Sequence, residues 1–415
     1  MTTNVRVNAG RLWSSLMDMA AIGATAKGGV RRIGLTDEDR QGRDLFRSWC
    51  DRQGYAVRID PCGNMFARRA GTERRLAPVL IGSHLDSQPT GGKFDGAFGV
   101  LAALEAMRTL DDLGVSTRRP IEIVNWTNEE GAVFRPMLGS EVFTGALALE
   151  AAYQLRDPAG ETLESRLRAI GYRGERALDP SDVHCYFEAH IEQGPILEIE
   201  RKTIGVVTGG IGLMWYKVKI VGVEAHAGPT PMIVRRDALM GAAEVALAVR
   251  EIAKAHGGGR GTVGCLTPYP ASPNVIPGLV EMTVDLRHEN AAELARMDSA
   301  FRAVVTTAVQ ENKLTSEVER TVDSPPIPFN PVLVGFVRDA AESLGFSHLD
   351  IVSGAGHDAF HMARRVPTAM IFIPCENGIS HNESENATQF DCEAGCNVLL
   401  QAALRAANEA SELQK

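Results

Sequence analysis

Short apolar segments alternate with longer amphipathic segments along much of this chain. Residues 78–82 and 121–126 are apolar enough for buried strands, and residues 100–110 between them have the pattern of a helix. Strands that alternate with helices build a largely parallel sheet with helices on its faces. We therefore expect an α/β fold, to which residues 368–373 add a strand and residues 392–412 a final helix.

The pattern changes after the paired glycines at 209–210, which permit a hinge. Strands and helices then follow in the order βαββαβ, as in ferredoxin-like domains. The predicted elements are strands at 215–221, 262–267, 279–287 and 315–322, with helices at 235–256 and 291–310. We expect a smaller domain at 211–326, inserted into a discontinuous domain made of 1–210 and 327–415.

The composition excludes several classes of protein. The 415 residues include 52 acidic and 43 basic side chains, which leaves a net charge of −9 and no bulk basic face for nucleic acid. No apolar run is long enough to predict a membrane span. The seven cysteines are scattered, so we expect small buried thiols and no disulfide framework. Because no secretory signal pattern is present, we expect a cytoplasmic protein.

Two polar residues with metal-binding chemistry lie near the strand predicted at 78–82. His84 follows that strand directly, where α/β sheets gather their ligands, and Asp86 is placed to hold its other ring nitrogen. Asp95 lies in a glycine-rich stretch before a helix. That position suits either a helix cap or a carboxylate that bridges two ions, and a simple loop histidine is the alternative for His84.

A pair of carboxylates follows the strand predicted at 121–126. Glu129 and Glu130 are adjacent, so their side chains point differently. Glu130 then suits a metal ligand and Glu129 a general base that faces a bound water. A solvated acidic loop is the alternative.

Two further histidines lie late in the chain. His190 and Glu192 share one side if their segment is extended, and His381 lies in a loop after the strand at 368–373. Solvent exposure is the alternative for His381. Taken together, the candidate ligands suit two first-row divalent ions that share one carboxylate: His84, Asp95, Glu130, His190 and His381.

Motifs along nearly the whole chain resemble the M20 family of metallo-aminohydrolases. Within it, the chain is similar to the hydantoinase/carbamoylase branch, which comprises N-carbamoyl-L-amino-acid hydrolases, β-ureidopropionases and allantoate amidohydrolases. The motifs that carry the resemblance are Gly82–Ser87, Gly91–Gly99, Asn128–Gly131, His190–Pro195, Ala225–Pro231, Asn274–Gly278, Gly354–Ala359 and Gly378–His381. One departure follows His381, where Asn382-Glu383 replaces the Ser-Pro common in the branch.

The resemblance implies a division of labour among the ligands. One ion, Zn²⁺, Mn²⁺, Co²⁺ or Ni²⁺, would be held by His84, Asp95 and His190. A second would be held by Asp95, Glu130 and His381. Glu129 would take a proton from the attacking water and pass it to the leaving nitrogen.

Further residues are candidates for contact with a substrate. The guanidinium of Arg287 matches a carboxylate, His226 suits an oxyanion donor, and Asn274 offers a donor and an acceptor. Their alternatives are a surface salt bridge, a loop histidine and a turn residue. The resemblance adds Gln193 and the backbone around Gly356 as substrate contacts. His357 is a candidate to support the site, with an ordinary hydrogen-bonded role in the core as its alternative.

The activity that the resemblance implies is hydrolysis of the carbamoyl C–N bond of N-carbamoyl-L-amino acids to amino acid, CO2 and ammonia. Allantoate or an N-acyl amino acid is the alternative substrate, and a non-catalytic binding protein on the same fold is the remote alternative. The inserted domain would act as a lid and would form a homodimer.

Overall fold

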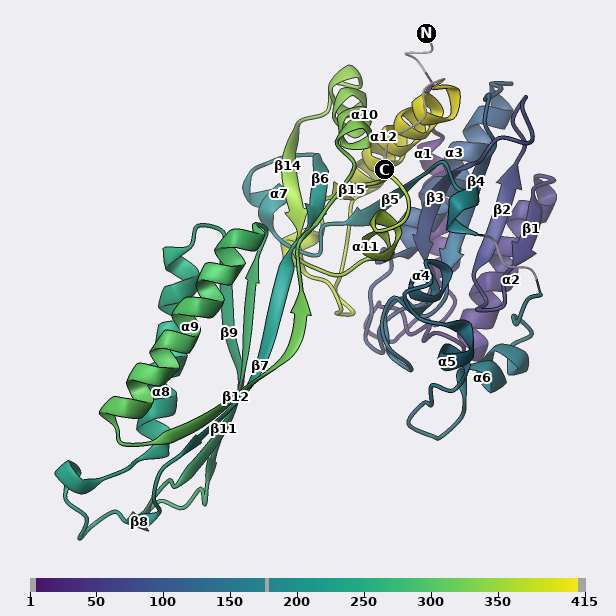
Figure 1. Cartoon of the computed structure of the whole chain (residues 1–415). Helices are drawn as coiled ribbons and strands as arrows, with labels where there is room; N and C mark the ends of the chain where they lie inside the picture. The colour runs from purple at the N-terminus through teal and green to yellow at the C-terminus, as the bar shows by residue number, and fades with distance from the viewer. Residues whose placement is uncertain (1–4, 176–178, 410–415) are drawn as a thin grey trace. The chain divides into compact units, whose positions relative to one another are not determined.

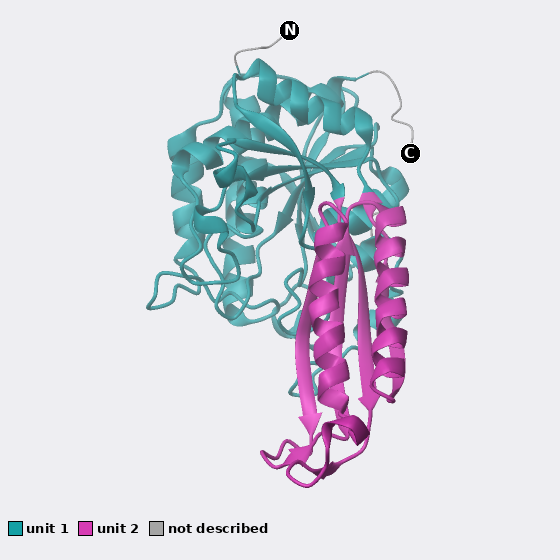
Figure 2. Ribbon diagram, turned by 90° about the vertical axis from the view of Figure 1, so that its left-hand side faces the viewer, with its two compact units in different colours: residues 1–209, 328–415 teal, residues 210–327 magenta. Residues whose placement is uncertain are grey.

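The computed structural model describes residues 5–175 and 179–409. The chain forms two compact units (Figure 2): unit 1 comprises Met1–Gly209 and Pro328–Lys415, and unit 2 is Gly210–Ile327. Each unit has its own cluster of buried apolar side chains.

Unit 1 is built on a mixed sheet with a parallel centre. In the described residues its order is β1-β2-β4-β3-β5-β15-β6-β13, and β14 pairs with β6. Strands β4, β3, β5 and β15 are parallel to one another, and β2 and β6 run antiparallel to them. The strands are β1 (Ala56–Ile59), β2 (Met65–Arg69), β3 (Val79–His84), β4 (Ile121–Trp126), β5 (Cys185–Ile191), β6 (Ile204–Gly210), β13 (Ile327–Pro328), β14 (His348–Ser353) and β15 (Thr368–Ile373).

Helices flank this sheet (Figure 1). Four helices that contact one another form one layer: α1 (Ala9–Ala20), α3 (Ala97–Asp112), α10 (Pro331–Ser343) and α12 (Gln389–Asn408). Helix α3 is apolar almost throughout and is buried from Ala97 to Leu110, as its place beneath β3 and β5 requires. The remaining helices are α2 (Asp37–Arg52), α4 (Leu138–Phe143), α5 (Leu149–Tyr153), α6 (Leu163–Ala169), α7 (Ile196–Ile199) and α11 (Asp358–Ala363). The prediction of an α/β fold with a mainly parallel sheet flanked by helices is confirmed.

Unit 2 is a four-stranded antiparallel sheet in the order β12-β7-β11-β9 with two helices packed on one face. Its elements follow the chain as β7 (Gly212–Val221), β8 (Ala225–His226), α8 (Ala238–Ala255), β9 (Arg260–Tyr269), β10 (Val275–Ile276), β11 (Leu279–His288), α9 (Ala291–Glu311) and β12 (Thr315–Ser324). Alternate residues of β7 and β11 are buried under the helices, and those between them are exposed or half-buried on the other face. Strands β8 and β10 form a separate two-stranded sheet.

The segment at His190 is extended, as strand β5, which ends at Ile191, before Glu192. Two other details differ from the expectations. The helices α4, α5 and α6 have no counterpart among the predicted elements, because each spans only five to seven residues and shows little periodicity. Six of the seven free cysteines are buried, but Cys265 is exposed because it lies on the uncovered face of the unit 2 sheet. No described helix is long and apolar enough to cross a membrane.

Candidate metal centre

The candidate ligands of unit 1 gather at the carboxyl ends of adjacent parallel strands. His84 is the last residue of β3, and His190 lies one residue before the end of β5. Glu129 and Glu130 follow β4, which pairs with β3. His381 follows β15, which pairs with β5. Open α/β sheets bind their ligands at this edge, and the strand order explains why these distant residues meet there.

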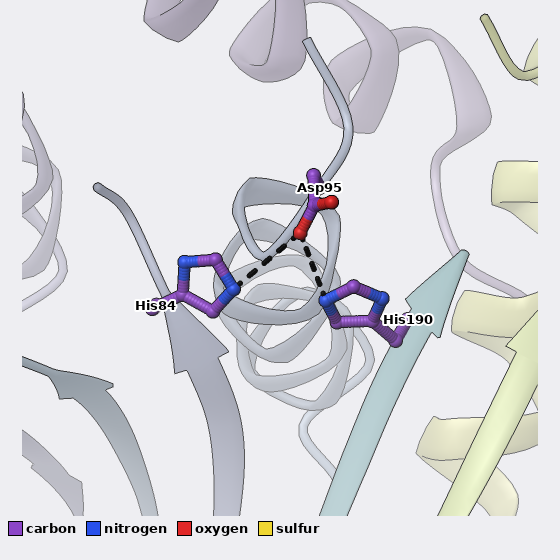
Figure 3. A group of neighbouring side chains, drawn as sticks. All are labelled: His84, Asp95 and His190. Atoms are coloured by element: carbon purple, nitrogen blue, oxygen red, sulfur yellow. Dashed lines mark ion pairs between the residues drawn. The ribbon is translucent and has the colours of Figure 1, made fainter. Parts of the chain in front are cut away.

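The carboxylate of Asp95 lies at the centre of this group (Figure 3). Its Oδ1 atom lies 3.5 Å from Nε2 of His84 and 3.2 Å from Nε2 of His190. Its Oδ2 atom lies 3.7 Å from Nε2 of His381 and accepts a 2.7 Å hydrogen bond from Nε2 of Gln193. Asp95 does not cap α3, because the N-cap residue is Gly96 and no side chain bonds the helix start. The two oxygen atoms therefore face two different groups of ligands.

The second group consists of Asp95, Glu130 and His381. Nε2 of His381 lies 3.2 Å from Oε2 of Glu130. His381 is exposed, as the alternative reading expected, with half of its side chain accessible, yet Nε2 lies near both carboxylates. The residues predicted as ligands thus form two sets of three that share Asp95, each compact enough to hold one ion.

The donor set fits metal ions on physical grounds. Nδ1 of His84 lies 3.0 Å from the main-chain carbonyl oxygen of Asp86, and Nδ1 of His190 lies 2.9 Å from that of Ile191. A carbonyl only accepts, so each Nδ1 carries a proton, and each ring presents a lone pair at Nε2 when it is neutral. Both Nε2 atoms lie near the same oxygen atom of Asp95, and Nε2 of His190 also accepts a 3.2 Å hydrogen bond from the main-chain N–H of Gly96. Such an arrangement is repulsive unless positive charge lies between the atoms.

The pKa values of the histidines are shifted in the direction that a demand for positive charge predicts. Burial disfavours charge on His84, yet the surrounding carboxylates, Glu129 first, raise its pKa well above its usual range. Burial opposes charge on His190 too, but Asp95 raises its pKa. The hydrogen bond to Glu130 raises the pKa of His381 to about 9. Without metal the rings attract protons, and a divalent ion would replace them.

Glu129 is buried beside the first group of ligands. Its Oε2 atom lies 3.5 Å from Nε2 of His84, and burial raises its pKa well above the ordinary range of a carboxyl group. A carboxylate with a raised pKa is suited to accept and return a proton near neutral pH.

The expected role of Asp86 is corrected in one respect. Its main-chain carbonyl, rather than its carboxylate, bonds Nδ1 of His84, and the carboxylate lies 3.8 Å from that nitrogen. The carboxylate instead accepts hydrogen bonds of 3.2 Å from the main-chain N–H groups of Glu129 and Glu130. Two buried N–H groups need an acceptor where β4 ends, and this carboxylate supplies it.

Sequence reasoning missed several residues that hold the ligands in place. Gln88 binds the Glu130 carboxylate at both oxygen atoms, through its main-chain N–H at 3.2 Å and its side-chain amide at 2.9 Å. Glu385 accepts from the main-chain N–H groups of Phe94 and Asp95. Gln88 directly follows a quoted motif, which is a usable signal, whereas Glu385 lies 290 residues from the peptide it binds and has no local pattern.

Two buried acids beneath the site were also missed. Burial raises the pKa of Glu188 and, more strongly, that of Asp358. Glu188 accepts from Ser83 and from the main-chain N–H of Ala359, and Asp358 accepts from Ser140. Asp358 lies inside the Gly354–Ala359 motif and Glu188 lies two residues before the His190–Pro195 motif, but the burial of neither could be predicted from those segments.

His357, predicted to support the site, packs edge-on against His190 with 4.5 Å between ring centroids. Burial lowers its pKa well below the usual range, so it is neutral. Glu188, His190 and His357 also have the spacing of a metal site. His190 has no nitrogen left for that group, because Nδ1 bonds Ile191 and Nε2 faces Asp95.

Two predicted substrate contacts lie in unit 1. Gln193 touches the shared ligand directly through its amide. Gly356 is exposed one residue before His357 and lies beside Met137, which a Cβ at Gly356 would approach to 3.1 Å.

The other predicted substrate contacts lie in unit 2, at opposite ends of its sheet. His226 is in β8, paired with Val275 of β10, and Asn274 is the residue before that pair. Both are exposed. Figure 1 shows β8 beyond the ends of β7 and β11. Arg287 pairs with Leu213 near the other end of the ladder and forms an ion pair with Asp285 at 2.8 Å.

Comparison with known proteins agrees with this fold and site. The profile of Peptidase family M20/M25/M40 matches residues 80–405. The N-carbamoyl-L-amino-acid amidohydrolase of Rhizobium meliloti is 48% identical over 406 residues, covering 97% of this chain and 98% of that protein. The allantoate amidohydrolase of Escherichia coli K12 is 34% identical over 385 residues, covering 92% and 94%. A crystal structure of a hydantoinase/carbamoylase family amidase from Burkholderia multivorans superposes with a TM-score of 0.95 at 51% identity, covering 98% and 100%.

The chain therefore belongs to peptidase family M20/M25/M40, and it is a hydrolase. Within that family it belongs with the hydantoinase/carbamoylase amidases, as its motifs predicted.

A glycine substitution tests the packing around His84. Gly96 has a φ of +63°, and a Cβ there would lie 2.3 Å from the His84 ring. Gly96→Ala should displace the ring and lower Zn²⁺ affinity by about tenfold or more. Gly114→Ala is the matched control, because Gly114 has a φ of +64° and nothing within 4 Å. In urea unfolding Gly114→Ala should lose about 1–2 kcal/mol of stability from its positive φ, and Gly96→Ala should lose more, because its ψ of −49° lies outside the left-handed helical region and its Cβ would meet the His84 ring. Equal Zn²⁺ affinity in both variants, measured by competition with a chromogenic chelator, would contradict this role.

Proposed function

We propose that this protein is a binuclear metal-dependent amidohydrolase that cleaves the carbamoyl C–N bond of N-carbamoyl-L-amino acids, releasing amino acid, CO2 and ammonia. The observation that carries the proposal is the pair of ligand groups sharing Asp95, with Glu129 beside them. The name of the Rhizobium meliloti relative supports the substrate class. Allantoate is the second candidate, supported by the name of the Escherichia coli relative.

Each ion would have its own ligand group. His84, Asp95 and His190 would hold one, and Asp95, Glu130 and His381 the other. When bound, Zn²⁺, Mn²⁺, Co²⁺ or Ni²⁺ would polarise the scissile carbonyl and lower the pKa of a water molecule. Imidazole and carboxylate ligands suit all four metals.

Glu129 would move the proton that hydrolysis requires. In its ionised form its Oε2 atom takes a proton from the attacking water and then delivers that proton to the leaving nitrogen. Burial raises the pKa of this carboxyl group, which makes its ionised form a stronger base than an exposed carboxylate. The Asp86 carboxylate keeps Glu129 in position by accepting a hydrogen bond from the main-chain N–H of Glu129.

The substrate carboxylate would be bound by Arg287, whose planar guanidinium can form two parallel hydrogen bonds. Arg287 lies on the uncovered face of the unit 2 sheet. Its ion-pair partner Asp285 and Trp215, which pairs with Asp285 across the strands, lie on the same face. His226 would stabilise the oxyanion, Asn274 would bind polar atoms of the substrate, and Gln193 and the backbone at Gly356 would complete the site.

Unit 2 alone cannot bring Arg287 and His226 to one small molecule. Leu213, which pairs with Arg287, and Val221 are eight residues apart on β7, and β8 lies beyond Val221. At a rise of about 3.4 Å per residue the separation exceeds about 27 Å. This distance supports the proposal of a homodimer, in which His226 and Asn274 of one copy serve the other.

The free cysteines suit the cytoplasm, where we place the protein.

Glu129→Gln removes the proposed base while conserving the shape of the side chain. We expect kcat to fall by about 10²–10⁴-fold because the proton transfer is lost. Metal content, measured by plasma mass spectrometry, should stay at the wild-type value, since Glu129 belongs to neither ligand group. Glu130→Gln, by contrast, should lose metal. Near-wild-type turnover of Glu129→Gln would contradict the assignment.

Mixing two inactive variants tests whether His226 acts across the dimer. Glu129→Gln and His226→Ala, unfolded and refolded together, form mixed dimers in which one site has both wild-type residues only if His226 serves the partner. Recovery should approach about one quarter of wild-type activity for a random mixture of C₂ dimers. If His226 acts within its own chain, the mixture stays inactive. Each variant refolded alone is the control.

Metal removal and a substrate screen test the proposed activity. Dialysis against a chelator should abolish ammonia release, and Zn²⁺, Mn²⁺, Co²⁺ or Ni²⁺ should restore it. N-carbamoyl-L-amino acids should give the highest kcat/KM in a panel with N-carbamoyl-β-alanine, allantoate and N-acetyl amino acids. A clear preference for allantoate would favour the second candidate, and activity that survives complete metal removal would refute the mechanism.

A further inference from the structure

Glu385 is a buried carboxylate that connects two loops of the metal centre and that the proposed chemistry does not use. It is 2% exposed. Its Oε1 atom accepts hydrogen bonds of 3.0 Å and 3.1 Å from the main-chain N–H groups of Phe94 and Asp95. Its Oε2 atom lies 3.3 Å from the hydroxyl of Ser380, which donates to Oδ2 of Asp95 at 2.8 Å. Glu385 therefore contacts the main chain of Asp95, the shared ligand, through one oxygen atom and Ser380, the residue before His381, through the other.

The surroundings of Glu385 leave no room for another arrangement. A Cβ on Gly92 would lie 2.1 Å from the Glu385 carboxylate, so a side chain at position 92 would expel it. The turn that presents Glu385 is closed by Asn382, whose carbonyl oxygen accepts from the N–H of Glu385 and whose side chain accepts from that of Ser384. Asn382 thus forms an Asx turn at the position where the branch commonly has Ser-Pro.

The two ligand groups depend on Glu385 to different degrees. His84 and His190 lie in strands, are 1% exposed, and have Nδ1 fixed by main-chain carbonyls. His381 lies in a loop, is 50% exposed, and has a φ of +53°, which a non-glycine residue keeps only where its surroundings impose it. Removing an anchor of this loop should therefore affect the group containing His381 far more than the other.

We propose that Glu385 is a positioning residue that ties the His381 loop to the peptide of Asp95 and thereby sets the metal affinity of the position formed by Asp95, Glu130 and His381. This inference rests on the proposed binuclear site. It also assigns an order to the two ions: the position containing His381 is the weaker one and releases its metal first.

Titration of metal-free protein with Zn²⁺, in competition with a chromogenic chelator, resolves the two binding steps. Glu385→Ala should weaken the weaker step by about tenfold or more, as loss of a residue that supports a ligand does, and should change the tighter step by less than about threefold. Glu385→Gln keeps an acceptor for the two N–H groups, so its weaker step should lie between those of Glu385→Ala and the wild type. Glu383→Gln is the matched control from the same loop. Glu383 forms an ion pair with Lys27 at 3.6 Å and contacts no candidate ligand in the described residues, so this variant should bind both ions as the wild type does.

The outcomes separate this role from a merely structural one. Equal weakening of both steps in Glu385→Ala, or no weakening of either, overturns the proposal. If Glu385→Ala does not fold, Glu385→Gln decides, and an unchanged weaker step in that variant overturns the proposal. Wild-type protein that binds no Zn²⁺, or only one ion, contradicts the binuclear function itself, whereas two normal steps in every variant contradict only the role of Glu385.

Discussion

The repulsion between two imidazole lone pairs and one carboxylate oxygen is the constraint around which unit 1 is arranged. Main-chain carbonyls fix a proton on Nδ1 of His84 and of His190, so in their neutral forms both rings direct an electron pair at Nε2 toward Oδ1 of Asp95. Such a centre is stable only with positive charge inside it. The strand ends, the glycine at position 96 and the carboxylate of Asp86 all act to hold atoms in place against that repulsion, which is the preorganisation that metal catalysis needs.

The centre is rigid on one side and adjustable on the other. Strands β3 and β5 hold two ligands by backbone pairing that is buried on both faces. The remaining histidine comes from a loop held by side-chain contacts, in a conformation that costs energy. In the proposed binuclear site, one ion would stay firmly bound while the other exchanges. The activity of such an enzyme would then depend on the concentration of available metal through the looser position alone.

The sequence predicted those parts of the site that follow from local pattern. Apolar runs in the sequence located β3, β4 and β15. Because parallel strands bring their carboxyl ends together, His84, Glu130 and His381 could be grouped from the sequence alone. Contacts between distant loops could not be predicted this way. The sequence around Glu385 does not predict its hydrogen bond to the main-chain N–H of Phe94. The sequence around Asp86 does not predict that its carboxylate binds the peptide after β4 rather than His84. Such contacts depend on which buried N–H groups lack an acceptor, and that is a property of the assembled fold.

In unit 2, the length of the β7–β11 ladder is likewise a property of the assembled fold. Register fixes how far Arg287 lies from His226, because each pair of residues added to both strands would move the far end by about 7 Å while keeping every side chain on its face. The shift at Thr283/Val284 against β9 leaves the β7–β11 pairing continuous, so this spacing is not interrupted. In the proposed dimer the ladder acts as a spacer: one end carries the group that binds the substrate carboxylate, and the other carries the groups that serve a second copy. The ten-residue strands also match the helices packed on them, because α8 has 18 residues and α9 has 21, so the same length serves both the core of unit 2 and the proposed reach.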